Sequence, residues 1–429
     1  MSTKLDLATL QSAVRGTAAA FRSRSTLQPA AGDGTKVFPP TYDKAAYATE
    51  ERRVRQPDGT IKTIPCVLLD SVQAQANRLE DALQAAIDAG RFSSSPIPVV
   101  QVDFPNENLL NAVGKITSLQ APHRIADAIL RDSLLDDKPF RKSETGEKLD
   151  HVSLQNATAL YELCPTALVF GIWDSTGPKG GLGAKFQRAF VSEVVGINVI
   201  KGAKTSSRID PLGIQKQAGP VFRTPEHSIT LDATQALQSS GKPILFGKRK
   251  GKDVTYNLKD ATFPDEGRPS AANHGNIVPS VSEGGVTLDY AEQTAVLSLP
   301  ALRRLHFPLA NGTRSQEIDA AGQTVLAALA LTAAALASET GFDLRSRCLL
   351  WPTGSLTWEL LDKPGAAPTP LTIDADNAIK VLAEAVTAAE ALGLKWRKEP
   401  LKLTPSPQLI TLLRRSQELA ATGAAETEE

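Results

Sequence analysis

The chain has 429 residues, which is long enough for a sizeable hydrophobic core and for two or three domains. Its 47 lysines and arginines are balanced by 47 aspartates and glutamates, so the net charge is zero. This excludes the large overall positive charge by which many proteins attract nucleic acids, and any site for a polyanion must be local.

Cysteines and histidines give no sign of a disulfide framework or a metal centre. Cys66, Cys164 and Cys348 are far apart and have apolar neighbours, as buried thiols in a reducing compartment do. None of the histidines stands at metal-ligand spacing from another, so we expect no metal and no cofactor. Residues 1–10 contain charges and lack the apolar stretch of a signal peptide, which favours a cytoplasmic location.

The N-terminal residues predict an arm followed by a hairpin. Residues 5–21 have a weak helical pattern and precede a linker rich in Pro, Gly and Ala at 28–40. We interpret this part as a solvated leader in preference to an RNA-contacting tail. Residues 56–59, Gln-Pro-Asp-Gly, separate two β-like runs and predict a hairpin whose second strand continues over residues 65–69.

A helix is predicted directly after this strand. Asp70 or Ser71 is suited to cap its start, and Gly90 to end it. Apolar residues recur along it at helical spacing, namely Val72, Ala76, Leu79, Leu83 and Ala86. We interpret its polar residues, Gln73, Asn77 and Glu80, as solvated. The patterns then predict a strand over residues 97–104, a helix over 125–135 and a charged loop over 139–150.

Most of the residues that suggest a binding site lie in the run of residues 167–194. Residues 167–173 are apolar, with β-branched and aromatic members, and predict a buried strand. The next residues predict a loop that another backbone can approach closely, because they include Gly177, Pro178, Gly180, Gly181 and Gly183. After them an amphipathic helix is predicted by the spacing of Phe186, Ala189, Phe190 and Val194. Its opposite face would carry Lys185, Arg188 and Ser192.

A glycine loop that leads into a helix with cations is suited to bind a polyanion backbone. The run is not a Walker A loop, because no Gly-Lys-Ser/Thr follows the glycines, and it contains no G-x-G-x-x-G fingerprint. On spacing alone, a strand-to-helix turn with solvated cations explains the run equally well.

Residues 201–290 are so often interrupted by proline and glycine that they predict an irregular insertion. The segment from Lys179 to Arg223 is basic, with eight cationic side chains against Glu193 and Asp210. Lys242 and residues 248–252 form a second basic cluster, which is most simply a solvated β-turn. The alternative is a groove in which single-stranded bases stack on Phe246 and Tyr256.

The last third of the chain predicts helices and strands. Residues 320–338 carry no charge and approach membrane-spanning length, but they are too weakly apolar, so a buried helix over 318–340 is preferred. Strands are predicted over 347–351 and 355–361, and helices over 374–392 and 405–421. Arg345 and Arg347, two residues apart on an extended segment, would point the same way, towards a phosphate or an acidic partner surface.

Three segments together resemble a known protein family. The first is the run of residues 167–194, with its Gly-Pro-x-Gly-Gly-x-Gly-Ala-Lys-Phe loop; it resembles the glycine-rich segment of the RAMP superfamily of CRISPR proteins. The others are residues 69–80, Leu-Asp-Ser-Val-Gln-Ala-Gln-Ala-Asn-Arg-Leu-Glu, and residues 343–348, Asp-Leu-Arg-Ser-Arg-Cys. The three together resemble the backbone RAMP subunit of type I-G (formerly I-U) CRISPR surveillance complexes.

The patterns alone predict an α+β fold. The resemblance implies an RRM-like (ferredoxin-like) palm built from discontinuous segments, with large insertions as fingers or a thumb. We expect an N-terminal arm and hairpin over residues 1–60 and the first part of the palm, with a helical insertion, over 61–200. An irregular basic insertion resembling a thumb or finger would follow over 201–290, and the remaining palm with C-terminal helices over 291–429.

The resemblance also implies a function, that of a non-catalytic Cascade-type subunit in antiviral defence. Copies would oligomerise along a CRISPR guide RNA (crRNA) and present it for pairing with target DNA. Further partners would be the RNA-processing and large subunits and a recruited helicase-nuclease, with no membrane. The expected RNA contacts are Gly177, Lys179, Gly180, Gly181, Gly183, Lys185, Arg188, Lys204, Arg208, Arg345 and Arg347. By resemblance, Gln75, Asn77 and Arg78 become candidates for subunit or RNA contacts.

The alternative function is that of an enzyme, either a RAMP-type nuclease or another phosphate-binding enzyme. RAMP backbone subunits of the RNA-cutting type III systems use a loop aspartate, and Asp174 is the matching candidate here. Near the glycine loop the other carboxylates are Glu193 and Asp210, and there is no histidine. We expect Asp174 to cap or brace the loop.

Overall fold

The computed structural model describes residues 3–55, 58–105, 109–175 and 185–421. The chain forms two compact units. Unit 1 consists of Met1–Lys201 with Gly285–Arg414, and unit 2 consists of Gly202–Gly284 with Arg415–Glu429. The fold is mixed α and β, with several sheets.

A large sheet organises unit 1. Eight strands follow one another in the order β1-β23-β22-β2-β19-β11-β4-β3, and the β20–β21 pair joins through β21, which pairs with β2. All neighbours are antiparallel except β1 and β23. The strands are β1 (Thr3–Lys4), β2 (Ala20–Pro29), β3 (Thr49–Arg55), β4 (Ile61–Asp70), β11 (Phe190–Ile197), β19 (Tyr290–Ser298), β20 (Phe342–Arg345), β21 (Cys348–Pro352), β22 (Trp358–Leu361) and β23 (Thr369–Thr372).

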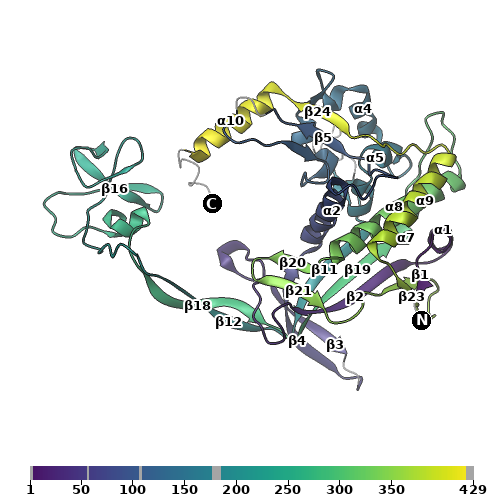
Figure 1. Cartoon of the computed structure of the whole chain (residues 1–429), viewed down its shortest axis with the longest axis horizontal. Coiled ribbons are helices and arrows are strands. Elements are labelled where there is room, and N and C mark those ends of the chain that lie inside the picture. Colours follow the sequence, from purple (N-terminus) through teal and green to yellow (C-terminus); the bar gives the residue numbers. More distant parts are fainter. Residues whose placement is uncertain (1–2, 56–57, 106–108, 176–184, 422–429) are drawn as a thin grey trace. The chain divides into compact units, whose positions relative to one another are not determined.

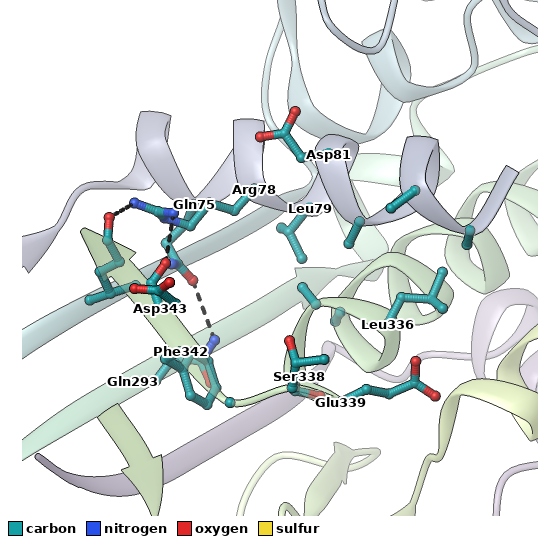
Figure 2. A pocket seen from close by; sticks show the side chains of 18 of the residues that line it. Gln75, Arg78, Leu79, Asp81, Gln293, Leu336, Ser338, Glu339, Phe342 and Asp343 are labelled. Carbon is teal, nitrogen blue, oxygen red and sulfur yellow. Dashed lines mark hydrogen bonds between the residues drawn. The ribbon is translucent and has the colours of Figure 1, made fainter. Parts of the chain in front are cut away.

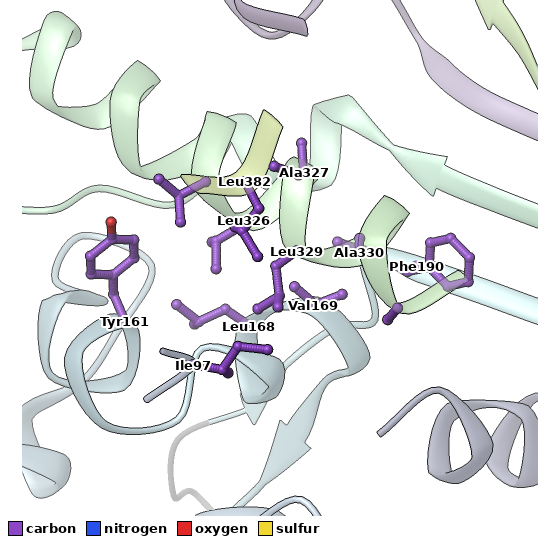
Figure 3. Packing of buried hydrophobic residues seen from close by; sticks show 14 of the residues in the cluster. Ile97, Tyr161, Leu168, Val169, Phe190, Leu326, Ala327, Leu329, Ala330 and Leu382 are labelled. Carbon is purple, nitrogen blue, oxygen red and sulfur yellow. The ribbon is translucent and has the colours of Figure 1, made fainter. Parts of the chain in front are cut away.

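Helices cover one face of this sheet (Figure 1). They are α1 (Leu7–Arg15), α2 (Val72–Asp88), α6 (Thr166–Phe170), α7 (Leu299–Arg303), α8 (Gln316–Ser338) and α9 (Ala375–Ala391). Helix α8 contacts each of the others, and its Leu326 and Leu329 lie near Val169 of α6 in the core (Figure 3). The helix predicted over 318–340 is therefore confirmed as a core helix. It is long and apolar enough to cross a membrane, but 89% of its apolar window is buried inside the protein.

Apolar and charged side chains alternate along β2, which explains why one face of the sheet is buried and the other is charged. Phe21 and Leu27 are fully buried, Phe21 in the core that contains the helices and Leu27 in a cluster with residues of β4, β20 and β21. Between them, Arg22 and Arg24 point to the opposite face and pair with carboxylates of neighbouring strands, Glu359 at 2.7 Å and Glu292 at 2.6 Å. The prediction of a solvated N-terminal leader is therefore wrong, because this period-two pattern places residues 20–29 in the middle of the sheet.

The hairpin and the helix predicted after it are confirmed. Strands β3 and β4 pair antiparallel, and α2 begins after Ser71, whose hydroxyl accepts a hydrogen bond from the Ala74 amide at 3.2 Å. Leu79 and Leu83 of α2 are buried in the core as the spacing predicted.

The elements predicted around the glycine loop are wrong. Residues 166–170 are helix α6, after which the short strand β9 (Ile172–Trp173) pairs with β10 (Lys185–Phe186). The predicted amphipathic helix is instead β10 and then β11, an interior strand between β19 and β4. Phe190 and Val194 share a face in a strand as well as in a helix, because four is a multiple of the strand period. The β-branched Val191, Val194, Val195 and Ile197 favour the strand.

A second sheet of five strands, β6-β5-β24-β7-β8, completes unit 1. Its strands are β5 (Val100–Asp103), β6 (Lys115–Thr117), β7 (Ser133–Leu135), β8 (Lys138–Pro139) and β24 (Leu401–Pro405). The helix predicted over 125–135 is wrong: a 3-10 turn, the short α3 (Ala128–Arg131) and β7 replace it, because Arg124 has a φ of 52° and Asp127 caps a new helix start. The short helices α4 (Glu144–Glu147) and α5 (Thr158–Leu163) follow, and α10 (Pro407–Ala421) comes after β24.

Unit 2 consists mainly of short strands. β12 (Ile200–Arg208) pairs with β18 (Ile277–Thr287) as a two-stranded ribbon. A five-stranded sheet contains β13 (Phe222–Arg223), β14 (Ile229–Thr230), β15 (Gln238–Ser239), β16 (Lys242–Arg249) and β17 (Lys252–Thr255). Its small core contains Phe222, Leu245 and Tyr256.

Candidate nucleic-acid interface

Two of the three sequence segments meet at a buried carboxylate. Asp70, at the end of β4, is fully buried and accepts hydrogen bonds from Gln75 Nε2 at 2.7 Å and Arg78 Nε at 2.9 Å, both from α2. Arg345 of β20 donates to Asp70 Oδ1 at 3.2 Å and to the Leu69 carbonyl at 2.6 Å. We call Asp70, Gln75, Arg78 and Arg345 the Asp70 centre.

The Asp70 centre joins α2 to four strands, β4, β11, β19 and β20. The Gln75 side-chain carbonyl accepts a hydrogen bond from Ser192 of β11 at 2.8 Å and one from Gln293 of β19 at 3.3 Å. Arg78 also donates to the carbonyls of Asp343 and Leu344 in β20. Removing one partner would leave buried polar groups unsatisfied, so this network fixes how the helix lies on the sheet.

A cleft of about 460 Å³ extends from this centre between α2, the end of α8 and β20 (Figure 2). Small side chains such as Ala82 and Ala85 line its middle, and Gln75 and Arg78 stand at one end. At the other end Arg91 pairs with Glu339 at 2.6 Å. Burial raises the pKa of Asp81 in the cleft wall, with Arg78 acting in the opposite direction.

A second polar region is formed by the β9–β10 pair. The strands pair antiparallel with Trp173 opposite Lys185, and the Lys185 Nζ lies 5.6 Å from the centroid of the Trp173 ring. Arg188 is exposed two residues after β10. Arg304, just after α7, is also exposed and donates to the Gln187 side chain at 3.1 Å. We call Trp173, Lys185, Arg188 and Arg304 the β9–β10 patch.

A buried ion pair supports the backbone beneath this patch. The carbonyl of Gly171, just before β9, accepts a hydrogen bond from Arg124 Nη1 at 3.1 Å. Arg124 binds the Glu80 carboxylate of α2 through Nε at 2.8 Å and Nη2 at 2.7 Å. A Cβ on Gly171, where φ is 83°, would lie 3.0 Å from Arg188 Cγ and 3.1 Å from its amide, so glycine permits this close approach. Burial raises the pKa of Glu80 to about 7, although Arg124 opposes the shift.

Sequence reasoning placed Glu80 on a solvated helix face, and this is wrong, because the side chain is buried against Arg124. It also missed Arg124 and Arg304. Arg124 stands just before the helix predicted over 125–135, and nothing in the local pattern singled it out.

Asp174, the candidate of the enzyme hypothesis, is buried beside the patch. Its carboxylate accepts a hydrogen bond from Arg141 Nη1 at 2.7 Å, and the same guanidinium binds Asp150. Within the described parts of the chain, no three His, Cys, Asp or Glu side chains are grouped closely enough to hold a metal ion.

The remaining predicted site residues lie in several places. Gly177, Lys179, Gly180, Gly181 and Gly183 lie outside the described residues. Lys204 and Arg208 are exposed on β12 in unit 2, with the Lys204 stem against Gly284. The prediction that Arg345 and Arg347 point the same way is wrong. Arg345 is bound in the Asp70 centre, whereas Arg347 has a φ of 61° and stacks on Phe38, 3.9 Å from the ring centroid.

Residues 248–252 of the second basic cluster form a β-turn. It connects β16 and β17, with Lys250 and Gly251 both at positive φ. Tyr256 is buried against Phe222 and Phe263, so its ring is not available to stack on a base, and the alternative of an aromatic groove there is wrong.

Comparison with known families adds an independent indication. Residues 21–201 match the family model described as CRISPR-associated protein GSU0053 (Cas_GSU0053). This region contains β2, β4, α2 and the β9–β10 pair, and therefore most of the residues described above. A search of curated proteins found no match. Over these residues the chain is similar to a CRISPR-associated family, and this match supports a role in a CRISPR-Cas system.

Proposed function

We propose that this chain is a non-catalytic crRNA-binding backbone subunit of a type I-G, Cascade-type CRISPR effector complex. Copies would line up along the guide RNA in the cytoplasm and hold it for pairing with target DNA. The large sheet of unit 1 with its helices would be the RRM-like RAMP palm. The RNA-processing subunit, the large subunit and the recruited helicase-nuclease would be its further partners.

The observation that carries this proposal is the β9–β10 patch. Lys185 and Arg188, from the segment at β10, and Arg304, just after α7, are exposed in unit 1, and within the described residues none has a carboxylate at salt-bridge distance. Local cations on a neutral protein suit an RNA backbone, which is bound through phosphates without regard to sequence.

The rival, a nuclease, would use Asp174 as a metal ligand or a base. The contact between Asp174 and Arg141 supports a bracing role, because a guanidinium already occupies the carboxylate and also holds Asp150. A catalytic carboxylate would have to leave this ion pair before it could bind a metal ion.

The test is to purify the full chain from cells that contain a CRISPR array and to extract any bound nucleic acid. We expect a discrete small RNA, and binding to a series of longer RNAs should become tighter as more copies fit side by side. A chain that carries no RNA and stays monomeric on long RNA contradicts the proposal. Metal-dependent cutting by the parent chain that is lost in Asp174→Asn would favour the nuclease.

A further inference from the structure

The β9–β10 patch contains an aromatic ring that binding to phosphates alone does not explain. Trp173 is 57% exposed, although it is among the largest apolar side chains of the protein. The other members of the patch, Lys185, Arg188 and Arg304, are cationic and do not form a wider hydrophobic surface with the ring. A protein partner that buries apolar area would need such a surface.

The backbone that carries the ring is held firmly. Trp173 pairs with Lys185 and Ile172 with Phe186, whose side chain is buried in the core. On the other side, Gly171 is held by the Arg124 guanidinium. A ring on a fixed backbone loses little conformational freedom when a ligand stacks on it, which favours binding.

Unpaired nucleobases are the ligand class that this combination suits. Single-stranded nucleic acids bind where bases stack on aromatic side chains and nearby cations hold the phosphates. The Lys185 ammonium lies over the ring, so a base would stack on the opposite face or displace this side chain, and Arg188 and Arg304 add two further exposed cations to the patch. A stacked base could therefore have its neighbouring phosphates on cations of the same patch.

We propose that Trp173 is a stacking platform for an unpaired base of single-stranded RNA, with Lys185, Arg188 and Arg304 holding the adjoining phosphates. This inference rests on the RNA binding proposed above and goes beyond it. It assigns to the patch a contact with a base, so that the protein would favour bases with larger rings.

The test measures binding of fluorescently labelled oligoadenylate and oligouridylate by anisotropy. Trp173→Ala should weaken binding of oligoadenylate roughly 5-fold or more, and that of oligouridylate less, because larger bases stack more strongly. Trp173→Phe should retain most of the affinity, whereas Trp173→Leu, which keeps apolar area without a ring, should not. The salt dependence should stay that of the parent in all three variants, since no cation is removed.

Trp351 provides a matched control, because it is 52% exposed on β21 and lies outside the patch. Trp351→Ala should leave both affinities within about 2-fold of the parent. Equal losses in Trp173→Ala and Trp351→Ala, or equal affinities in Trp173→Phe and Trp173→Leu, would overturn the stacking platform alone. A parent chain that binds neither oligonucleotide would overturn the proposed RNA binding itself, and the platform with it.

Discussion

The Asp70 centre and the β9–β10 patch both contain arginine side chains, but these are paired with acceptors in the centre and exposed in the patch. In the Asp70 centre, the guanidinium groups of Arg78 and Arg345 donate hydrogen bonds to one buried carboxylate and to backbone carbonyls. In the patch, Arg188 and Arg304 are exposed, and in the described residues no carboxylate lies close enough to neutralise them. A basic residue in a recognisable motif can therefore brace the fold, and its exposure and pairing decide whether it remains available for a ligand.

The largest expected effect is at the Asp70 centre. Asp70→Ala should lower the free energy of unfolding by about 3–5 kcal/mol, because it leaves two guanidinium groups without their buried partner. Urea unfolding followed by circular dichroism measures it. The exposed Asp362→Ala should change stability by less than about 0.5 kcal/mol. A similar small change in Asp70→Ala would show that the centre does not brace the fold.

The ion pair beneath the patch should make stability depend on pH. Burial raises the pKa of Glu80 from 4.5 to about 7, so between these values the folded protein keeps a proton that the unfolded chain has released. The free energy of unfolding should therefore fall as pH rises through this window, by at most about 1.4 kcal/mol per pH unit. Glu80→Gln should flatten this dependence, and the exposed Glu399→Gln should not. Parallel profiles for all three proteins would contradict the shift.

The patch should determine the salt dependence of RNA binding. Replacing Lys185 and Arg188 together with Ala should lower the slope of log affinity against log salt by roughly 1.4, at about 0.7 for each single-strand phosphate. Stability should be unaffected, unlike in Asp70→Ala. The control is the double replacement of Lys363 and Lys402, two exposed lysines outside the patch, which should keep the parent slope. An unchanged slope in the first variant would remove these two residues from the interface.

The smallest expected effect is at Arg347. This residue tests whether an arginine outside both regions braces the fold or binds RNA. Its guanidinium stacks on Phe38, so Arg347→Ala should cost about 0.5–1 kcal/mol of stability. RNA affinity should stay within about 2-fold of the parent if the residue only braces the fold. A loss of RNA affinity without a loss of stability would assign Arg347 to the RNA-binding residues instead.

Local patterns determined much of the fold from the sequence alone. The pairing of β3 with β4, the cap at Ser71 and the apolar spacing along α2 and α8 depend on residues close together in the sequence, so their outcome could be predicted. The period of four shared by Phe190 and Val194 could not be resolved in this way, because it suits a helix and a strand alike. These residues form a strand because β11 pairs with β19 and β4, which are far away in the sequence.

For the candidate site, residue type and spacing predicted which segments matter, whereas contacts between distant segments set the role of each residue. Residue type and spacing singled out Lys185, Arg188, Arg345 and Asp174, since these properties are written in the chain itself. Whether a charge is free depends on a partner that another segment supplies. Asp70 binds Arg345 across 275 residues, and Arg141 reaches Asp174 across 33. Such long-range pairing depends on how distant segments pack in the core, and a local sequence pattern does not predict this packing.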